Sequence, residues 1–144
     1  MIKVALVDDH VILRKSLAVL IGMLQDFKVV IEAGNGKEFI DQLNEQQLPD
    51  LVLMDITMPV MDGVETTKWL KQHYPSIKVV ALSMIKNDLV VIRMLKNGAR
   101  GYILKDSEPA DLKAAIDSVL SKGYHYSEMV TGKLIHSINT MDED

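Results

Sequence analysis

Two patterns of apolar residues alternate along this 144-residue chain. Short runs rich in valine, leucine and isoleucine are typical of buried strands, and they occupy residues 2–7, 28–31, 51–54, 77–82 and 101–104. Between these runs, apolar residues recur every three or four positions, which predicts helices over residues 11–24, from about 36, and over 63–73, 88–96 and 108–120. This alternation predicts an α/β fold, a parallel sheet with right-handed crossovers and helices on both faces.

Turn-forming residues mark several boundaries of these elements. Asn35 and Glu38 stand three positions apart before an apolar stretch, which is the spacing of a capping box at a helix start. Gly98 is a stop signal after the fourth helix, and Pro109 fits the first turn of the fifth. We expect one domain over residues 1–122, and over 123–144 an extra helix from about residue 128 with an acidic tail or linker.

Composition narrows the class of protein. With 48% hydrophobic residues, the chain is able to bury a sizeable core as one domain. A net charge of -4 argues against the broad basic surface of a direct nucleic-acid binder. Cysteine is absent, so disulfides and thiolate chemistry are excluded. The sequence shows no signal-peptide pattern and no apolar run near the roughly 18 residues of a membrane span, so we expect a cytoplasmic protein.

Polar side chains follow four of the five expected strands. Asp8 and Asp9 end the first strand, Asp55 the third, Ser83 the fourth and Lys105 the fifth. In a flavodoxin-like, doubly wound sheet of order 2-1-3-4-5, the first and third strands are neighbours, and ligands bind at the crevice between their carboxyl ends. The three carboxylates are therefore expected to converge on one pocket, where their repulsion demands a raised pKa or a cation.

An all-oxygen donor set of this kind suits Mg²⁺. Zinc is not expected, because the set contains no Cys or His ligand and His10 is interpreted as a loop residue. A carboxylate can act as a nucleophile and form an aspartyl-phosphate where positive groups neutralise the phosphoryl oxygens. A cation, the Lys105 ammonium and the Ser83 hydroxyl supply such groups around Asp55. Each aspartate alone is typical of a helix cap or a turn, so the hypothesis depends on their joint placement.

These motifs resemble the receiver domain of two-component response regulators. The resemblance covers roughly residues 1–122 and rests on VDDH at the first strand, MDITMPVMDG around Asp55, ALS ending at Ser83 and GYILK ending at Lys105. DDH, GARGYILKD, AAIDSVLSKGYHYS and the extra helix from Glu128 are similar to the LuxR/NarL-type group of DNA-binding regulators. The resemblance implies a signalling switch that accepts a phosphoryl group from a histidine kinase or a small phosphodonor and turns over no outside substrate.

The resemblance also implies roles for the acidic residues. Asp55 is expected to be the phosphoacceptor. Asp9 and Asp55 would bind Mg²⁺ directly, together with the backbone carbonyl of Thr57, and Asp8 would reach the ion through water.

Further implied roles concern the switch. Lys105 would pair with the phosphoryl group, and Ser83 would swing in to hydrogen-bond it. Tyr102 matches the aromatic switch position of the family, although its place alone indicates only a half-buried aromatic on an edge strand. Phosphorylation would bias the face formed by the fourth helix and fifth strand toward a partner or a second copy. Candidate residues of this face are Ile85, Leu89, Val90, Val91 and Arg93, although simple packing of the fourth helix also accounts for most of the apolar ones.

Three features depart from the family pattern. Asp106 follows Lys105 where many receivers have proline, often with a cis bond. Met84 follows Ser83 where a small residue is frequent, and its bulk predicts a longer-lived phosphorylated state. LuxR-type regulators continue into a helix-turn-helix DNA-binding domain that is not in this sequence. We therefore expect a fragment cut at the linker rather than a stand-alone receiver, with DNA bound only through the output domain.

Other functions are weighed against this one. A Mg²⁺-dependent phosphatase with an aspartate nucleophile usually has a second acid two residues later, but Thr57 stands there. A flavin-binding module would place an anionic phosphate next to three carboxylates without a metal, and this repulsion argues against it. A phosphorylation-independent dimerisation module would have no need of the metal ligands, so the complete set of acidic residues argues against it.

Overall fold

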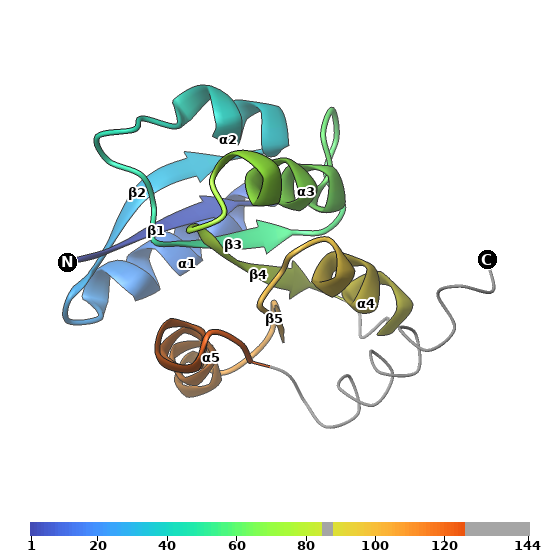
Figure 1. The fold of residues 1–144 in the computed structure, drawn as a ribbon. Helices are drawn as coiled ribbons and strands as arrows, with labels where there is room; N and C mark the ends of the chain where they lie inside the picture. Colours follow the sequence, from blue (N-terminus) through green and yellow to red (C-terminus); the bar gives the residue numbers. More distant parts are fainter. Residues whose placement is uncertain (85–87, 126–144) are drawn as a thin grey trace.

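The computed structural model describes residues 1–84 and 88–125 (Figure 1). Five parallel strands form one sheet in the order β2-β1-β3-β4-β5. The strands are β1 (Ile2–Val7), β2 (Phe27–Ala33), β3 (Leu51–Asp55), β4 (Lys78–Ser83) and β5 (Gly101–Leu104). The helices are α1 (Val11–Met23), α2 (Gly36–Gln42), α3 (Gly63–His73), α4 (Asp88–Lys96) and α5 (Pro109–Lys122). None of these described helices has the length and apolarity needed to cross a lipid bilayer. The predicted α/β fold and strand order are confirmed.

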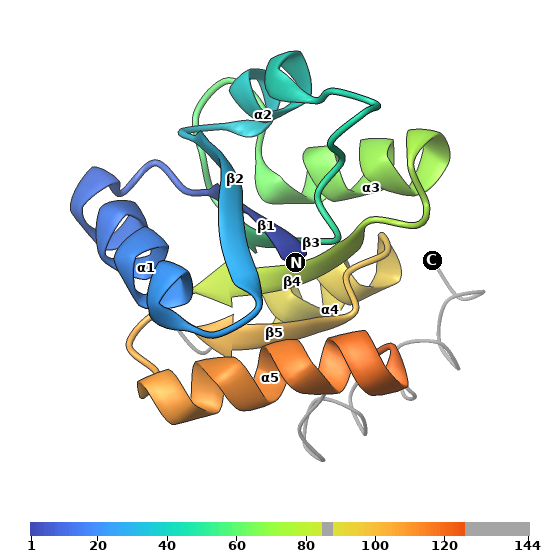
Figure 2. The same cartoon turned by 90° about the vertical axis from the view of Figure 1, so that its left-hand side faces the viewer.

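Helices cover both faces of the sheet, with α1 and α5 on one side and α2, α3 and α4 on the other (Figure 2). The core accordingly forms two clusters. Phe39 and Leu70 belong to the cluster under α2, α3 and α4, and Ile21 and Ile116 to the one under α1 and α5. Every residue of β3 is buried because both of its faces are covered, which explains its unbroken apolar run. The strand that ends in Asp55 is thus held on both sides.

β2 and α5 are longer than predicted. Backbone pairing with β1 continues from Phe27 to Ala33 and takes the charged Glu32 into the sheet, because strand pairing overrides the weak β-propensity of glutamate. α5 continues to Lys122 and ends at Gly123, which adopts the left-handed conformation (φ 90°) of a helix C-cap. The extra helix expected from about residue 128 lies outside the described residues.

The start of α2 contains the predicted capping box in a modified form. The side chain of Asn35 accepts a hydrogen bond from the backbone N–H of Glu38 at 3.0 Å. The carboxylate of Glu38 accepts in return from the N–H of Gly34 at 2.8 Å, one residue earlier than in the usual box. The helix start inferred from these residue types is therefore correct.

The connection from β3 to α3 fixes the end of β3. Asp62 caps α3 by accepting a hydrogen bond from the backbone N–H of Glu65 at 2.9 Å. The N–H of Gly63 donates to the carbonyl of Ile56 at 2.8 Å, and a Cβ at Gly63 would overlap the carbonyl oxygen of Asp55. Glycine is required here by the close approach of two backbone segments, so Asp55 and the first turn of α3 form one rigid unit.

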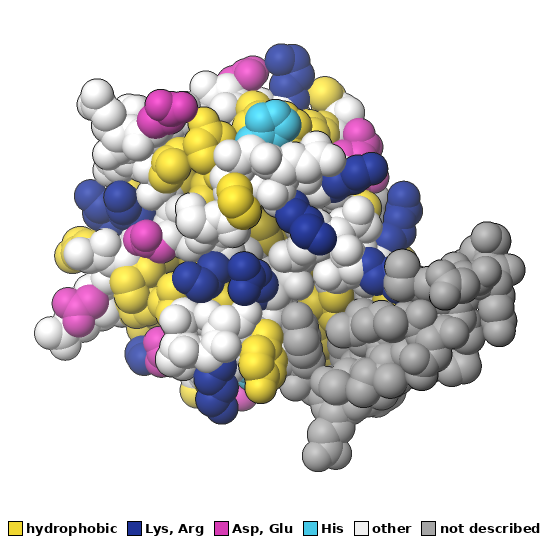
Figure 3. Space-filling model, in the orientation of Figure 1, with side chains coloured by type: hydrophobic (Ala, Val, Ile, Leu, Met, Phe, Trp, Pro, Cys, Tyr) yellow, Lys and Arg dark blue, Asp and Glu magenta, His cyan; other side chains and the backbone are white. Residues whose placement is uncertain are grey.

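Charge is divided unevenly along the chain. Residues 66–105 contain eight Lys and Arg residues and one acidic residue, Asp88, which gives a net charge of +7 against -11 for the rest. Figure 3 shows Lys and Arg side chains spread over the face that carries α3 and α4. The ends of β1 and β3 belong to the acidic part and those of β4 and β5 to the basic part. The two parts therefore meet at the carboxyl edge of the sheet.

Replacing Gly63 with alanine is expected to destabilise the protein. The added Cβ forces apart α3 and the end of β3, and overpacking of this kind costs about 1–3 kcal/mol. Urea denaturation followed by the fluorescence of Trp69, the single tryptophan, measures the free energy of unfolding. Gly22→Ala is the matched control, because Gly22 lies in α1 and a Cβ there meets nothing within 4 Å. The control is expected to be neutral or up to about 1 kcal/mol more stable, and equal stability of the two variants would contradict the prediction.

Candidate functional site

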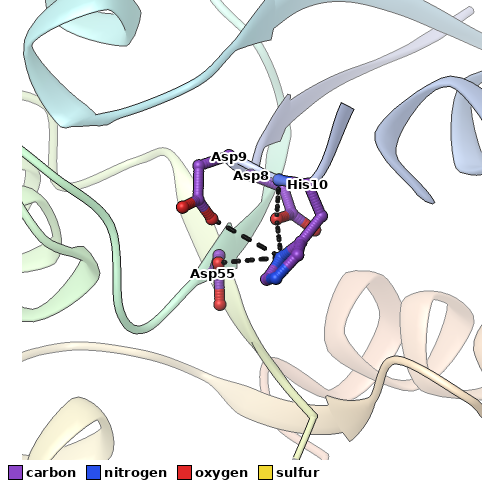
Figure 4. A group of neighbouring side chains, drawn as sticks. All are labelled: Asp8, Asp9, His10 and Asp55. Atoms are coloured by element: carbon purple, nitrogen blue, oxygen red, sulfur yellow. Dashed lines mark hydrogen bonds and ion pairs between the residues drawn. The ribbon is translucent and has the colours of Figure 1, made fainter. Parts of the chain in front are cut away.

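The carboxyl edge of the sheet contains a pocket of about 420 Å³. It is lined by Asp9, His10, Asp55, Ile56, Thr57, Leu82, Ser83, Met84, Val90 and Lys105. Figure 4 shows that Asp8, Asp9 and His10, from the end of β1, point toward Asp55, from the end of β3. The structure thus brings the three carboxylates together at the crevice between β1 and β3.

Lys105 lies in the middle of this group. Its Nζ is 3.0 Å from Asp8 Oδ1 and 3.1 Å from Asp55 Oδ2. The side chains of Lys105 and Asp8 are each 1% exposed, so water contributes little to their solvation. A buried ammonium between buried carboxylates offsets the repulsion that would otherwise separate them. The backbone N–H of Lys105 donates to the carbonyl of Ser83 at 2.8 Å, which fixes the backbone of Lys105 beside the end of β4.

The two buried carboxylates respond differently to these surroundings. Burial acts to raise the pKa of Asp8, but the backbone N–H of His10, 2.9 Å from Oδ1, and the ammonium of Lys105 hold the pKa below its usual value. Burial raises the pKa of Asp55 to about 7, and Lys105 offsets only part of that effect. Asp8 therefore favours its ionised form, whereas the charge of Asp55 depends on what else enters the pocket.

His10 belongs to the site, although its sequence position indicates only a loop residue. It is the N-cap of α1 but makes no side-chain capping bond. Its ring turns into the pocket, with Nδ1 2.9 Å from Asp8 Oδ1, 3.5 Å from Asp9 Oδ1 and 2.8 Å from Lys105 Nζ. A neutral Nδ1 accepts from Lys105, whereas a protonated one donates to Asp8. The sequence signal was the unbroken DDH triplet, which places three donor side chains in one short turn.

Thr57 and Ser83 also line the pocket. Met84 lines it beside Ser83, with its residue surface 62% exposed. Tyr102 lies apart, half-buried on β5, where it lines a separate surface hollow with His125. The carboxyl edge therefore contains the predicted aspartates together with Ser83 and Lys105, whereas Tyr102 lies outside this pocket.

Asp106 does not draw Lys105 away from the pocket. In the described part of the chain no peptide bond is cis, so the backbone after Lys105 lacks the cis geometry common among receivers. Asp106 is exposed, whereas the ion pairs of Lys105 in the described structure are with Asp8 and Asp55. The extra carboxylate leaves the buried ion pairs intact.

The donor set fits a divalent cation. Asp8 Oδ2 and Asp55 Oδ2 are buried oxygens that make no hydrogen bond in the described structure, since the contact of Asp55 with Lys105 is an ion pair without hydrogen-bond geometry. One ligand atom from each of Asp8, Asp9, His10 and Asp55 lies within 4.8 Å of the others. Carboxylate oxygens grouped in this way are the ligands of Mg²⁺ and similar hard cations.

The family model for the response regulator receiver domain matches residues 4–117, which span the sheet and the acidic pocket. The chain belongs to the response regulator receiver family. Receiver domains are signalling switches, and they typically use Mg²⁺ at an acidic pocket of this kind.

Full-length regulators are among the relatives of this receiver domain. The nitrate/nitrite response regulator NarL of Escherichia coli (strain K12) is 40% identical over 135 residues, which are 94% of this chain and 62% of NarL. The transcriptional regulatory protein LnrK of Bacillus subtilis (strain 168) is 37% identical over 136 residues, which are 94% of this chain and 61% of LnrK. The chain thus spans about three-fifths of the length of these curated relatives.

A solved structure of a LuxR-family regulator is also similar to this chain. The crystal structure of a LuxR-family two-component response regulator from Aurantimonas sp. SI85-9A1 matches with a TM-score of 0.80 and 29% identity, covering 94% of this chain and 96% of that one. The predicted receiver fold and its LuxR/NarL-type character are confirmed.

Asp55→Asn is expected to stabilise the metal-free protein at alkaline pH. The pKa of Asp55 is about 7 in the folded protein against the usual 3.8, so the folded state binds more protons between these values. The stability that this extra proton binding contributes to the folded state is fully present below about pH 4 and is lost as the pH rises through about 7. Removing the charge should raise the free energy of unfolding by about 2–4 kcal/mol at pH 8.

Urea denaturation in metal-free buffer at pH 5 and pH 8 checks this. The gain should shrink toward pH 5, because the native carboxyl is then protonated. Asp41→Asn, at an exposed position on α2, is the control and should change stability by less than about 0.5 kcal/mol at either pH. An equal gain for Asp55→Asn at both pH values contradicts the assignment of a raised pKa.

Proposed function

We propose that this receiver domain is a phosphorylation-dependent switch in which Asp55 accepts a phosphoryl group. The observation that carries the proposal is the ion pair between Asp55 Oδ2 and Lys105 Nζ, 3.1 Å apart, with side chains only 7% and 1% exposed. A carboxylate at the end of a rigid strand, facing a buried ammonium in an open pocket, has the placement that a nucleophile needs. The ionised Asp8 keeps the ammonium at that position.

The proposed reaction is an in-line displacement at phosphorus. A carboxylate oxygen of Asp55 attacks, and one O–P bond forms. The P–N bond of a phosphohistidine or the P–O bond of acetyl phosphate breaks, and the leaving group takes the bonding electrons. Lys105 pairs with the phosphoryl oxygens, and the Ser83 hydroxyl donates a hydrogen bond to one of them. Slow hydrolysis returns Asp55 and inorganic phosphate, so the domain turns over no outside substrate.

Mg²⁺ is the proposed cofactor. Asp9, Asp55 and the backbone carbonyl of Thr57 would bind it directly, and Asp8 would reach it through water. When bound, the ion supplies positive charge to the phosphoryl oxygens, which complements the single charge of Lys105.

The proposed switch links the pocket to β5. A phosphoryl group adds about -1.5 to -2 of charge, which attracts Ser83 and Lys105. Tyr102 stands opposite Ala81 of β4 in the sheet, two pairs before Ser83, which pairs with Leu104. In the proposal it turns inward as Ser83 moves, and the face of α4 and β5 changes shape.

That face is the proposed contact for a partner or a second copy. Leu89 is 80% exposed and Arg93 is exposed, so both are available to a partner. Val91, expected on this face, is 1% exposed and packs in the core instead, because it lies on the inner side of α4. Val90 is half-buried and lines the phosphoacceptor pocket. Ile85 lies outside the described residues.

Response regulators pair with histidine kinases, and we propose such a kinase or a small phosphodonor as the source of the phosphoryl group. Phosphorylation would favour a homodimer. Because the relatives are longer transcriptional regulators, we propose that residues 1–122 act as the receiver and that 123–144 lead toward a helix-turn-helix output domain. DNA would be bound only by that output domain, in the cytoplasm.

Incubation with acetyl phosphate and Mg²⁺ tests the phosphoacceptor. Intact-mass spectrometry should show a phosphate-sized gain in the wild-type chain and in Asp41→Ala, whose aspartate is exposed on α2. The gain should be absent in Asp55→Ala and strongly reduced in Lys105→Ala, because the first lacks the nucleophile and the second lacks the buried ammonium. Absence of any gain across a range of Mg²⁺ concentrations would instead support a phosphorylation-independent dimerisation module.

Met84 is expected to prolong the phosphorylated state. Met84 lines the pocket together with Ser83, and in the proposal its bulk restricts the approach of water to the phosphoryl group. Met84→Ala should therefore speed the loss of phosphate several-fold, as followed by the decay of the phosphorylated mass after removal of the donor. Val60→Ala is a control, because Val60 is an exposed apolar residue of the β3–α3 loop outside the pocket lining. An unchanged decay rate in Met84→Ala rules this role out.

A further inference from the structure

His10 brings a nitrogen donor into a pocket whose other candidate metal ligands are oxygens. Its Nδ1 lies 2.9 Å from Asp8 Oδ1, 3.5 Å from Asp9 Oδ1 and 3.8 Å from Asp55 Oδ2 (Figure 4). The imidazole side chain is 53% exposed, so it can approach and leave the pocket without repacking the core. A nitrogen at this position changes the class of cation that the pocket prefers.

The separations match the ligand shell of a small divalent cation. Zn²⁺ binds histidine nitrogen and carboxylate oxygen at about 2.0–2.2 Å, which places tetrahedral neighbours about 3.3–3.6 Å apart. The three distances from Nδ1 to the carboxylates bracket this value. Small side-chain rotations would bring all of the donors to one centre.

Two buried oxygens indicate independently that a cation fits here. Asp8 is 1% exposed and Asp55 is 5% exposed, yet Oδ2 of each makes no hydrogen bond in the described structure. The Asp55 oxygen is also the one that faces His10 Nδ1. Lys105 Nζ stands among these donors, 2.8 Å from His10 Nδ1, as a single positive charge facing several carboxylates.

We propose that the pocket binds Zn²⁺ through His10 Nδ1 together with the carboxylates of Asp9 and Asp55 and the neighbouring Asp8, as a metal state distinct from the Mg²⁺ state. Mg²⁺ keeps to oxygen ligands and gains little from an imidazole, whereas Zn²⁺ binds imidazole strongly. His10 is therefore the residue that decides between the two classes of cation. The inference rests on the pocket of the proposed function and adds a statement about its selectivity.

The zinc state has a consequence for Lys105. The ammonium cannot stay 2.8 Å from a nitrogen that has given its lone pair to a cation, so Lys105 moves away from His10. Zn²⁺ and Mg²⁺ would share the carboxylates of Asp9 and Asp55, so the two cations are expected to compete for the pocket.

Isothermal titration calorimetry on the full chain tests the selectivity. ZnCl₂ and MgCl₂ are titrated separately into wild type, His10→Gln and His73→Gln. His10→Gln keeps the backbone N–H that holds Asp8, and it should weaken Zn²⁺ binding about ten-fold or more while changing Mg²⁺ affinity less than three-fold. His73, an exposed histidine whose ring stacks on Trp69, is the matched control and should leave both affinities unchanged.

Ring-nitrogen NMR of histidine-labelled protein gives a second readout. The Nδ1 resonance of His10 should show a metal-bound shift with Zn²⁺ and none with Mg²⁺. Unchanged Zn²⁺ affinity in His10→Gln overturns the inference, and so does an equal loss of both cations, which would mark a general disturbance of the acidic residues. Labelling of Asp55 by acetyl phosphate is measured on the same samples. If wild type is not labelled but His10→Gln still weakens Zn²⁺ binding selectively, the result counts against the phosphoacceptor proposal alone.

Discussion

The position of one buried ammonium governs the carboxyl edge of this sheet. Three carboxylates from two adjacent strands converge there, and such like charges would repel strongly in a region with little water. Lys105 Nζ lies within 3.1 Å of both buried members, Asp8 and Asp55. Asp8 receives further donation from the backbone of His10 and stays ionised, whereas burial raises the pKa of Asp55. The edge thus contains one carboxylate with a lowered pKa and one with a raised pKa, although both are aspartates.

The scaffold makes this arrangement stiff where chemistry requires it. β3 is covered on both faces, and Gly63 brings the first turn of α3 against the carbonyl of Asp55, so the backbone of Asp55 has little freedom. The groups that change position on phosphorylation are expected elsewhere, on Ser83 and beyond the end of β5. The part of the chain that supplies them is basic, with a net charge of +7 over residues 66–105. An added phosphoryl charge would therefore pull the basic part toward the acidic part across the edge where they meet.

The sequence predicts most of the fold because each strand leaves a strong local pattern and because parallel strands share one edge. That rule alone places Asp8, Asp9, Asp55, Ser83 and Lys105 together before any coordinates are known. It could not place His10, since the direction of the imidazole depends on the backbone of a short turn and on the rotamer, and neither is encoded in residue spacing. The full length of β2 was also beyond local patterns, because its ends are set by pairing with β1 rather than by apolar residues. Conversely, an apolar residue such as Val91 is compatible with a contact face or with helix packing, and only the packing of α4 shows that it belongs to the core.

The geometry also bears on the proposed use of a cation together with the lysine. The Nζ of Lys105 contacts Asp8, Asp55 and His10 at 2.8–3.1 Å. An ammonium that neutralises two carboxylates has little attraction left for an incoming phosphoryl oxygen. In the proposed function, a divalent cation bound by the carboxylates would leave Lys105 available to pair with a phosphoryl oxygen. In the proposal the two positive groups are therefore sequential partners of the same acids, with the cation bound by the carboxylates and the lysine paired with the phosphoryl oxygens.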